Sequence, residues 1–323
     1  MLYPLKFKPI AKTKIWGGES LRRLPRHWSE SQRIGECWEI SGLLGNESVV
    51  ENGVLAGNTL NELLEVYMSD LVGDHVYGRY GDTFPLLLKL IDAADDLSVQ
   101  VHPDDALAQK MGEPFGKTEI WYVLDALKNA AVILGFKRAV TPEELYQRVH
   151  AGTLLEVLQR HLVQRGDVIM VPAGTVHAIC KGCMLLELQQ SSDTTYRLYD
   201  YDRLQSSGLK RPLHVNEALT AIDYEHWKHT VITPECCHNT LVNVADCKYF
   251  TMNQMILDKA HEYDLAPIDS FVLLSCVEGV VHCSAPEGVE NIAAGETLLV
   301  PAAINSMILI PDGEAKLLEM FIR

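Results

Sequence analysis

Two stretches of sequence decide the fold: GDVIMVPAGTVH at residues 166–177 and GETLLVPAAINS at residues 295–306. They align without gaps, because each runs from a glycine and an acidic residue through mostly apolar residues to Val-Pro-Ala. Self-similarity of this kind predicts two similarly folded β domains in one chain. In the alignment, Ser306 of the second copy stands at the position of His177 in the first. A chance match is the alternative, since the shared pattern is short.

The sequence around these stretches is mostly strand-like. Short runs broken by turn signals fill residues 1–57, and strands dominate from residue 166 onward. Helical patterns are inserted at about 58–72, 103–112 and 141–162. We expect the last insertion to form two helices, one up to residue 152 and one over 153–162, and we expect a further helix near 215–222. Helices and strands do not alternate one for one, so we predict a mainly β sandwich or barrel and not a doubly wound parallel sheet. We expect a first domain over 1–225, which carries the three insertions, and a second over 226–323.

Charge and composition restrict the partners. Asp and Glu number 43 against 28 Lys and Arg, a net charge of −15, which disfavours nucleic acid and anionic membranes but leaves room for a local cationic site that binds a small anion. No apolar stretch is long enough to span a bilayer, and the first residues lack the pattern of a signal peptide. We therefore expect a cytoplasmic protein with reduced cysteines, and we interpret Cys180 and Cys183, a C-x-x-C without a second pair, as ordinary loop thiols.

Strand alternation brings four candidate metal ligands together. In LSVQVHP, residues 97–103, Ser98, Gln100 and His102 share one face of a strand, and the aliphatic residues share the other. Glu119 lies in the next strand pattern, and His177 follows the turn after Pro172. Two imidazoles, a carboxylate and an amide oxygen suit zinc and leave room for a substrate or water. The spacing alone leaves open that each histidine is an ordinary surface or hydrogen-bonded residue.

The residues Gly166, Pro172, Gly174 and His177 match the second sequence motif of the cupin barrel, whose histidine is a metal ligand. The run FPLLLKLIDAADDLSVQVHPDD, residues 84–105, together with GKTEIWYVLDA, VPAGTVHAI and LLELQQSSDTTYRLYDYDR, resembles type I phosphomannose isomerase, and in length the short bacterial form. The resemblance covers most of residues 1–215, including Trp16-Gly17-Gly18 and Glu36-x-Trp38. It implies two jelly-roll cupin domains, with one zinc ion per chain held in the first by Gln100, His102, Glu119 and His177.

The resemblance also implies roles for eight further residues. Catalytic roles fall on Arg197, Glu187 and Lys117, and contacts to the substrate or its phosphate fall on Ser98, Lys89, Arg203, Glu36 and Trp16. Arg203 stands where longer family members carry lysine. The general base stays open between Glu187, Lys117 and a zinc-bound water, in that order of preference.

The implied reaction is the zinc-dependent interconversion of mannose 6-phosphate and fructose 6-phosphate by proton transfer between C1 and C2 through an enediolate. No nicotinamide or P-loop motif is present, which agrees with a reaction that has no net redox change. A metal-dependent cupin dioxygenase and a non-catalytic sugar-binding protein with two cupin domains are the alternatives, and Gln100 with the cations Lys117 and Arg197 disfavours the first. We expect a small-molecule sugar phosphate as the partner, a monomer or weak homodimer, and a second domain without metal.

Overall fold

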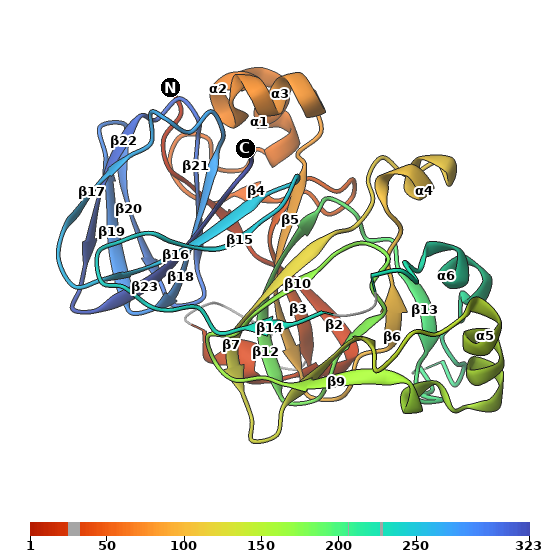
Figure 1. Ribbon diagram of the computed structural model, residues 1–323. Helices are drawn as coiled ribbons and strands as arrows, with labels where there is room; N and C mark the ends of the chain where they lie inside the picture. The colour runs from red at the N-terminus through yellow and green to blue at the C-terminus, as the bar shows by residue number, and fades with distance from the viewer. Residues whose placement is uncertain (25–32, 206, 227–228) are drawn as a thin grey trace.

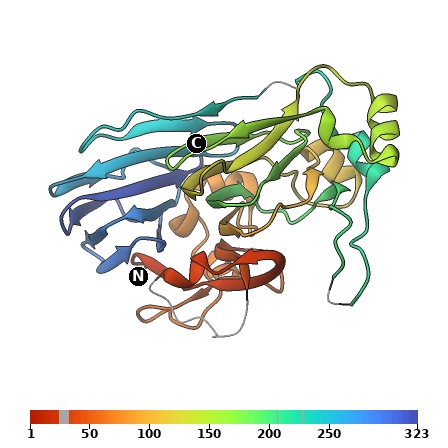
Figure 2. The ribbon, with the colours of Figure 1, turned by 90° about the horizontal axis from the view of Figure 1, so that it is seen from below.

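The computed structural model describes residues 1–24, 33–205, 207–226 and 229–323. As predicted, the protein is mainly β, with two groups of sheets and a few short helices (Figure 1). The sheets formed from the C-terminal residues lie at one end of the molecule, and helices α5 (Pro142–Ala151) and α6 (Val215–Ala221) lie at the other (Figure 2). Among the described residues, no helix is long and apolar enough to cross a membrane.

The first group of sheets forms the barrel that contains the candidate site. A seven-stranded sheet runs in the order β14 (Val231–Ile232), β10 (Val168–Val171), β7 (Glu119–Ala126), β12 (Cys183–Gln190), β5 (Leu86–Ala93), β2 (Ile10–Gly18) and β3 (Ile34–Ser41). A five-stranded sheet runs in the order β13 (Tyr196–Tyr199), β6 (Val99–Val101), β11 (His177–Ile179), β8 (Ala131–Phe136) and β9 (Leu158–Leu162). Residues of both sheets, such as Trp121 and Leu134, share one core cluster, so the sheets pack face to face.

The second group has the same two-sheet plan. Its larger sheet runs in the order β15 (Val242–Asp246), β16 (Thr251–Leu257), β23 (Ala315–Phe321), β18 (Val272–Glu278), β21 (Thr297–Val300), β1 (Leu5–Lys8) and β4 (Val49–Val50). Its smaller sheet runs in the order β17 (His261–Asp264), β22 (Ser306–Pro311), β19 (Val280–Ala285) and β20 (Gly288–Ala293). The N-terminal strand β1 pairs with β21, with Leu5 opposite Leu299. The division at residue 225 stays a prediction, and the chain begins in the sheet that also holds the C-terminal strands.

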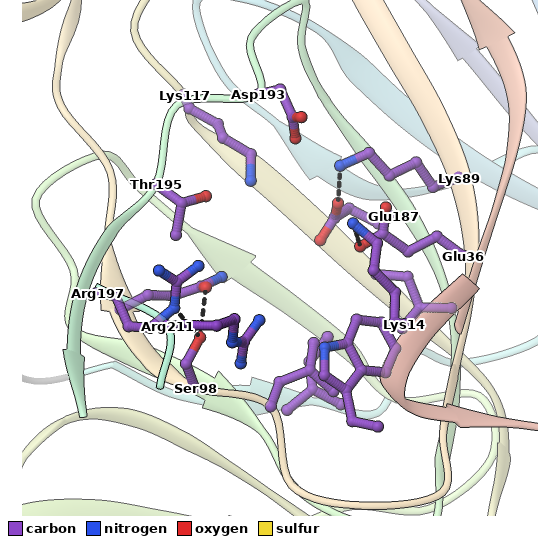
Figure 3. A pocket seen from close by; sticks show the side chains of 15 residues that line it. Lys14, Glu36, Lys89, Ser98, Lys117, Glu187, Asp193, Thr195, Arg197 and Arg211 are labelled. Carbon is purple, nitrogen blue, oxygen red and sulfur yellow. Dashed lines mark hydrogen bonds and ion pairs between the residues drawn. The ribbon is translucent and has the colours of Figure 1, made fainter. Parts of the chain in front are cut away.

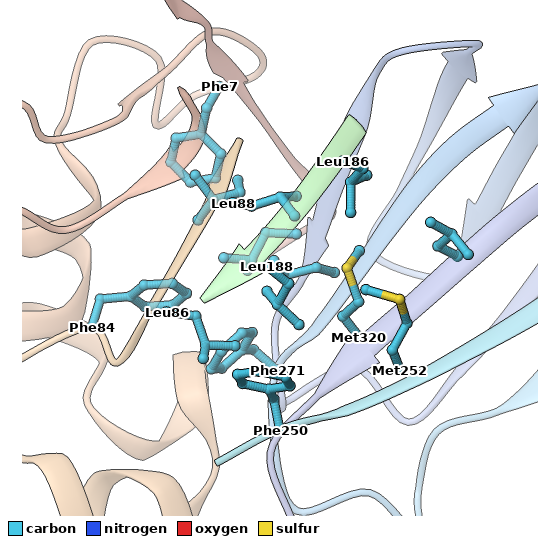
Figure 4. Close-up of a cluster of buried hydrophobic side chains, with 14 of the residues drawn as sticks. Phe7, Phe84, Leu86, Leu88, Leu186, Leu188, Phe250, Met252, Phe271 and Met320 are labelled. Atoms are coloured by element: carbon cyan, nitrogen blue, oxygen red, sulfur yellow. The ribbon is translucent and has the colours of Figure 1, made fainter. Parts of the chain in front are cut away.

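Alternation along β5 and β12 separates the interface from the site. Leu86 and Leu88 of β5, with Leu186 and Leu188 of β12, join Phe250, Phe271, Met252 and Met320 in the core between the two groups of sheets (Figure 4). The residues between these leucines point the opposite way, into the first barrel. The two strands pair with Lys89 opposite Glu187, so a lysine and a glutamate are buried on that inner face.

The helices follow their local sequence signals, with one correction. Helices α1 (Leu60–Tyr67), α2 (Ser69–Val72) and α4 (Asp105–Lys110) lie within the predicted insertions, and α3 (Asp74–Tyr80) extends the first beyond its expected end. Helix α5 begins after a Thr141 cap and ends at Gly152, whose φ of 69° is left-handed. The second helix predicted over 153–162 is wrong: residues 154–156 form one 3₁₀ turn, and Leu158–Leu162 form β9, which pairs with the edge of β8. The apolar spacing of this segment suits either element, and the strand satisfies the edge of the sheet.

The two copies of the internal repeat have similar structures, but the side chains at their last positions point to different faces of their sheets. Gly166 and Gly295 both have left-handed φ, at 89° and 87°, and each comes shortly before a buried strand, β10 or β21. His177 then begins β11 with its side chain buried, whereas Ser306 begins β22 with an exposed side chain. In the gapless alignment, Ser306 therefore corresponds to His177, although the Ser306 side chain lies on the outer face of its sheet and the His177 side chain lies on the inner face.

Candidate active site

A cavity of about 250 Å³ opens into the first barrel between its two sheets (Figure 3). Its lining is mostly charged and polar and comes from strands of both sheets and the loops that join them: Lys14, Trp16, Glu36, Lys89, Ile91, Leu97, Ser98, Gln100, Lys117, Ile179, Glu187, Asp193, Thr195, Arg197 and Arg211. Most of the sequence-predicted site residues are in this set. His102, Glu119 and His177 lie behind it in the buried wall, and Arg203 is not part of the lining.

Strand pairing brings the candidate metal ligands to one point. His177 of β11 stands opposite Gln100 of β6, and Glu119 begins β7 opposite Val171 of β10. The ligand atoms offered by His102, Glu119 and His177 all lie within 4.8 Å of one another, and all three side chains are buried. The convergence predicted for these three residues is therefore present in the fold.

Both histidines are oriented by their backbone contacts. Nδ1 of His102 lies 2.8 Å from the carbonyl oxygen of Thr194, and Nδ1 of His177 lies 2.8 Å from that of Thr175. A carbonyl can only accept, so each Nδ1 carries the proton and each Nε2 presents a lone pair. That lone pair accepts from Nζ of Lys117 at 3.0 Å in His102 and from the amide nitrogen of Gln100 at 3.3 Å in His177. Both Nε2 atoms face Glu119, at 3.5 Å and 3.4 Å. Burial, followed by the charge of Lys117, lowers the pKa of His102 to about 3, so the ring is neutral at pH 7, as a metal ligand must be.

Glu119 supplies the negative charge of the group. Neither of its buried carboxylate oxygens takes part in a hydrogen bond within the described part of the chain, although Nζ of Lys117 lies 3.2 Å from Oε2. Burial raises the pKa of Glu119, but Lys117 and the two imidazoles outweigh it and hold the pKa well below its ordinary value. A buried carboxylate with unused lone pairs, beside two unprotonated imidazole nitrogens, is a donor set suited to a divalent cation.

Gln100 completes the group on the side of the cavity. Its amide nitrogen lies 3.3 Å from Nε2 of His177, and its oxygen accepts from the hydroxyl of Ser98 at 3.4 Å. Rotation of the amide by 180° exchanges nitrogen and oxygen, and it would turn the oxygen toward the imidazole nitrogens. Gln100 can thus offer the fourth ligand that the sequence predicts.

A buried ion pair lines one wall of the cavity, next to the metal-ligand group. Nζ of Lys89 lies 3.1 Å from Oε1 of Glu187 and donates to Oε1 of Gln189 at 2.6 Å, and Trp121 Nε1 donates to Oε2 of Glu187 at 2.9 Å. Burial, followed by the nearby charge of Glu119, raises the pKa of Glu187 above its ordinary value, while Lys89 acts in the opposite direction. Glu187 is therefore a carboxylate of increased basicity, held in place by two donors and facing the cavity.

The opposite side of the cavity is cationic. Arg197 donates from Nε to the hydroxyl of Ser98 at 3.3 Å, and Arg211 lines the same side (Figure 3). Arg211 is oriented by the buried carboxylate of Asp200, which accepts from its Nε at 2.7 Å. Two guanidinium groups on one side of a small cavity form a site for a planar or tetrahedral oxyanion.

Arg203 binds the same Asp200 carboxylate from outside the cavity lining. Its Nη2 donates to the same Asp200 at 2.7 Å, and its Nη1 donates to the carbonyl oxygen of Asp96. Its predicted contact with phosphate stays a prediction, because Arg203 lies outside the cavity lining.

Sequence reasoning missed two cations of the lining, Arg211 and Lys14. Lys14 lies 3.0 Å from Oε1 of Glu36, next to Trp16, so it accompanies two residues that were predicted. Lys14 and Trp16 lie two residues apart on β2, so alternation could have assigned them to one face. Arg211 lies in the loop between β13 and α6, where no periodic pattern gives a comparable signal.

The two-sheet barrel with a buried His–Glu–His group defines the protein as cupin-like, with a candidate metal centre. The model for the catalytic domain of type I phosphomannose isomerase matches residues 5–131. The mannose-6-phosphate isomerase ManA of Bacillus subtilis is 40% identical over 311 residues, 95% of each chain, and the enzyme of Streptococcus mutans is 44% identical over 222 residues, 69% of this chain and 68% of the relative. The crystal structure of the Bacillus subtilis mannose 6-phosphate isomerase superposes with a TM-score of 0.86 at 33% identity, covering 99% of this chain and 100% of that one. The chain belongs to the type I phosphomannose isomerase family and is an isomerase.

Proposed function

We propose that the protein interconverts mannose 6-phosphate and fructose 6-phosphate, with zinc bound by His102, Glu119, His177 and Gln100. The observation that carries this proposal is one cavity of about 250 Å³ that is lined by a basic buried carboxylate, two guanidinium groups and Gln100, with the buried His–Glu–His group directly behind Gln100. The family of the chain and the sugar phosphates named in its relatives agree with it. When bound, zinc would supply positive charge for the oxygen that becomes negative at C1 or C2.

The cationic side of the cavity binds the phosphate. Arg197 and Arg211 offer charge-assisted hydrogen bonds to the dianion, and the hydroxyls of Ser98 and Thr195 lie beside them. Anchoring the phosphate at that side directs the other end of the sugar toward Glu187 and the metal ligands. Such positioning converts a loosely bound substrate into one that is held for proton transfer.

Glu187 is the proposed base. In the direction from aldose to ketose it takes the proton from C2, and the same carboxyl group returns a proton to C1, while a proton moves between O1 and O2. The raised pKa of Glu187 favours proton uptake, and Trp121 with Lys89 fixes the carboxylate in one orientation. Glu36 and Trp16 line the cavity near Lys14, and we assign them to contacts with the sugar.

We also propose one zinc ion per chain, a metal-free second domain over 226–323, a catalytic domain over 1–225, a monomer or weak homodimer, and a cytoplasmic location. In the second group of sheets, the described residues contain no further cluster of metal-ligating side chains.

Turnover in deuterium oxide tests the reaction and its proton-transfer step together. The protein is freed of metal with a chelator, reloaded with zinc and incubated with mannose 6-phosphate, and the product is followed by proton NMR. We expect fructose 6-phosphate that carries solvent deuterium at C1, and turnover that depends on zinc. Product without deuterium would show that the hydrogen passes from C2 to C1 without exchange with solvent, and absence of product with the reloaded protein would refute the function.

A further inference from the structure

The second group of sheets contacts the catalytic barrel at a point that leads to Lys117. Tyr249 lies in the turn between β15 and β16 and is buried, and its hydroxyl donates to Oδ2 of Asp105 at 2.6 Å. Asp105 is the first residue of α4, so this bond joins a C-terminal turn to the helix that follows the ligand strand β6. A hydrogen bond to an ionised carboxylate is among the stronger bonds in proteins.

The other oxygen of Asp105 holds the segment around Lys117. Oδ1 accepts from the backbone N–H of Gly116 at 3.0 Å and from Nε2 of Gln190 at 2.9 Å. The amide oxygen of Gln190 accepts in turn from the backbone N–H of Thr118 at 2.9 Å. The backbone N–H groups on both sides of Lys117 are thus fixed through one carboxylate, and the N–H of Lys117 itself donates to the carbonyl oxygen of Pro103 at 2.9 Å.

Close packing makes this segment sensitive to the position of Asp105. A Cβ at Gly116 would lie 2.5 Å from the carbonyl carbon of Asp104 and 2.6 Å from the backbone nitrogen of Asp105. Backbone therefore lies directly on backbone, and a shift of α4 moves residues 116–118 with it. Lys117 then carries the shift into the cavity, where its Nζ lies 3.0 Å from His102 and 3.2 Å from Glu119.

We propose that Tyr249 is a positioning residue for Lys117, acting through Asp105, so that the C-terminal sheets contribute to the reaction without lining the cavity. Tyr249 does not touch the cavity, and its effect on turnover passes through the orientation of the Lys117 ammonium group. This inference rests on the proposed function, since it assigns Lys117 to the active site.

Tyr249→Phe removes only the hydroxyl group. We expect kcat/KM to fall about tenfold, equivalent to about 1.4 kcal/mol, with unchanged zinc content. Tyr263→Phe is the matched control, because Tyr263 is a buried tyrosine of the same group of sheets whose hydroxyl has no hydrogen-bond partner in the described part of the chain. The control should stay within about twofold of the wild type.

A double-mutant cycle separates positioning from general destabilisation. Tyr249→Phe is measured in the wild-type and in the Lys117→Met background, both as kcat/KM and as Kd for fructose 6-phosphate. We expect its effect to shrink below about twofold in both readouts once Lys117 is absent. If Tyr249→Phe does not fold, Asp105→Asn, which replaces one of the two acceptor oxygens by an amide NH2 group, enters the cycle in its place.

The outcomes are distinct. Additive effects in the cycle, or a Tyr249→Phe protein as active as the wild type, would overturn the positioning role while leaving the isomerase function intact. A wild-type protein that fails to turn over mannose 6-phosphate would instead refute the proposed function.

Discussion

Arg211 gives the sharpest test of the anion side of the cavity. Its guanidinium group has five N–H donors, and Asp200 occupies two of them, through Nε and Nη2, so three remain for a ligand. Arg211→Met removes these donors and the charge while keeping much of the aliphatic stem. Asp200 stays paired after the change, because Arg203 continues to donate to it at 2.7 Å. The substitution therefore removes a contact to the ligand without leaving a buried carboxylate unpartnered.

The expected loss follows from the strength of such a contact. A hydrogen bond to a charged group contributes about 1.5–3 kcal/mol. At about 1.4 kcal/mol per decade, Arg211→Met should weaken the binding of fructose 6-phosphate by roughly ten- to one-hundred-and-fifty-fold. The assay is isothermal titration of the zinc-loaded protein, with competitive inhibition of turnover by inorganic phosphate as a second measurement. Binding of unphosphorylated fructose should change by less than about threefold, since it lacks the dianion.

Arg203→Met is the matched control, since Arg203 shares Asp200 with Arg211 but lies outside the cavity lining. The geometry predicts a change of less than about threefold in the affinity for fructose 6-phosphate. The sequence resemblance instead predicts that Arg203 contacts phosphate and that its loss is costly. An equal loss in both variants would support the prediction from sequence, and an Arg211→Met protein with wild-type affinity would refute the reasoning from geometry.

Three further predictions concern the base, the metal and the C-terminal sheets. Glu187→Gln should lower kcat by roughly two or more decades with unchanged zinc by elemental analysis, and near-normal turnover would move the base elsewhere. Zinc at a hundred times its Kd should add about 2.7 kcal/mol to the unfolding free energy of chelator-treated protein, and His177→Gln should remove most of this increase. Burial raises the pKa of Glu319 above its ordinary value of 4.5, although Asn253 acts in the opposite direction. The folded state thus holds this proton to higher pH than the unfolded state, so the contribution of Glu319 to stability is lost as pH rises above about 4.5. In urea titrations, the stability of Glu319→Gln relative to the wild type should therefore increase between pH 4 and 7, and its turnover should be unchanged.

Part of the candidate ligand group could be predicted from the sequence by local rules. Alternation places Gln100 and His102 on one face of a strand, and the turn after Pro172 begins the strand that carries His177. The backbone carbonyls that orient the two imidazoles, from Thr194 and Thr175, have no sequence signal, because any residue supplies the same carbonyl group. The convergence of His102, Glu119 and His177 was therefore predictable with the help of the family resemblance, and the tautomers of the two histidines were not.

Features that depend on long-range pairing were less predictable. The segment 153–162 has an apolar spacing that suits a helix as well as a strand, and its pairing with β8 decides between them. The N-terminal strand Leu5–Lys8 pairs with Thr297–Val300, at the other end of the chain, and nothing in either stretch specifies the partner. Arg211 lies in a loop whose sequence has no periodic pattern, and its side chain is directed to the cavity by its hydrogen bond to Asp200.

The structure shows how the C-terminal sheets, whose described residues contain no cluster of metal-ligating side chains, are joined to the barrel that holds the candidate site. Strands β5 and β12 bury leucines such as Leu88 and Leu188 against Met252 and Met320 on one face, while Lys89 and Glu187 point into the cavity from the other. If the C-terminal sheets were absent, the apolar face of both strands would meet water, at a cost of about 1.5–3 kcal/mol for each fully exposed leucine. The same two strands carry the ion pair between Lys89 and Glu187, whose atoms lie 3.1 Å apart and which holds the proposed base in place. Packing between the barrels and the proposed chemistry inside one of them therefore use the two faces of one strand pair, so a substitution that shifts either strand should affect both.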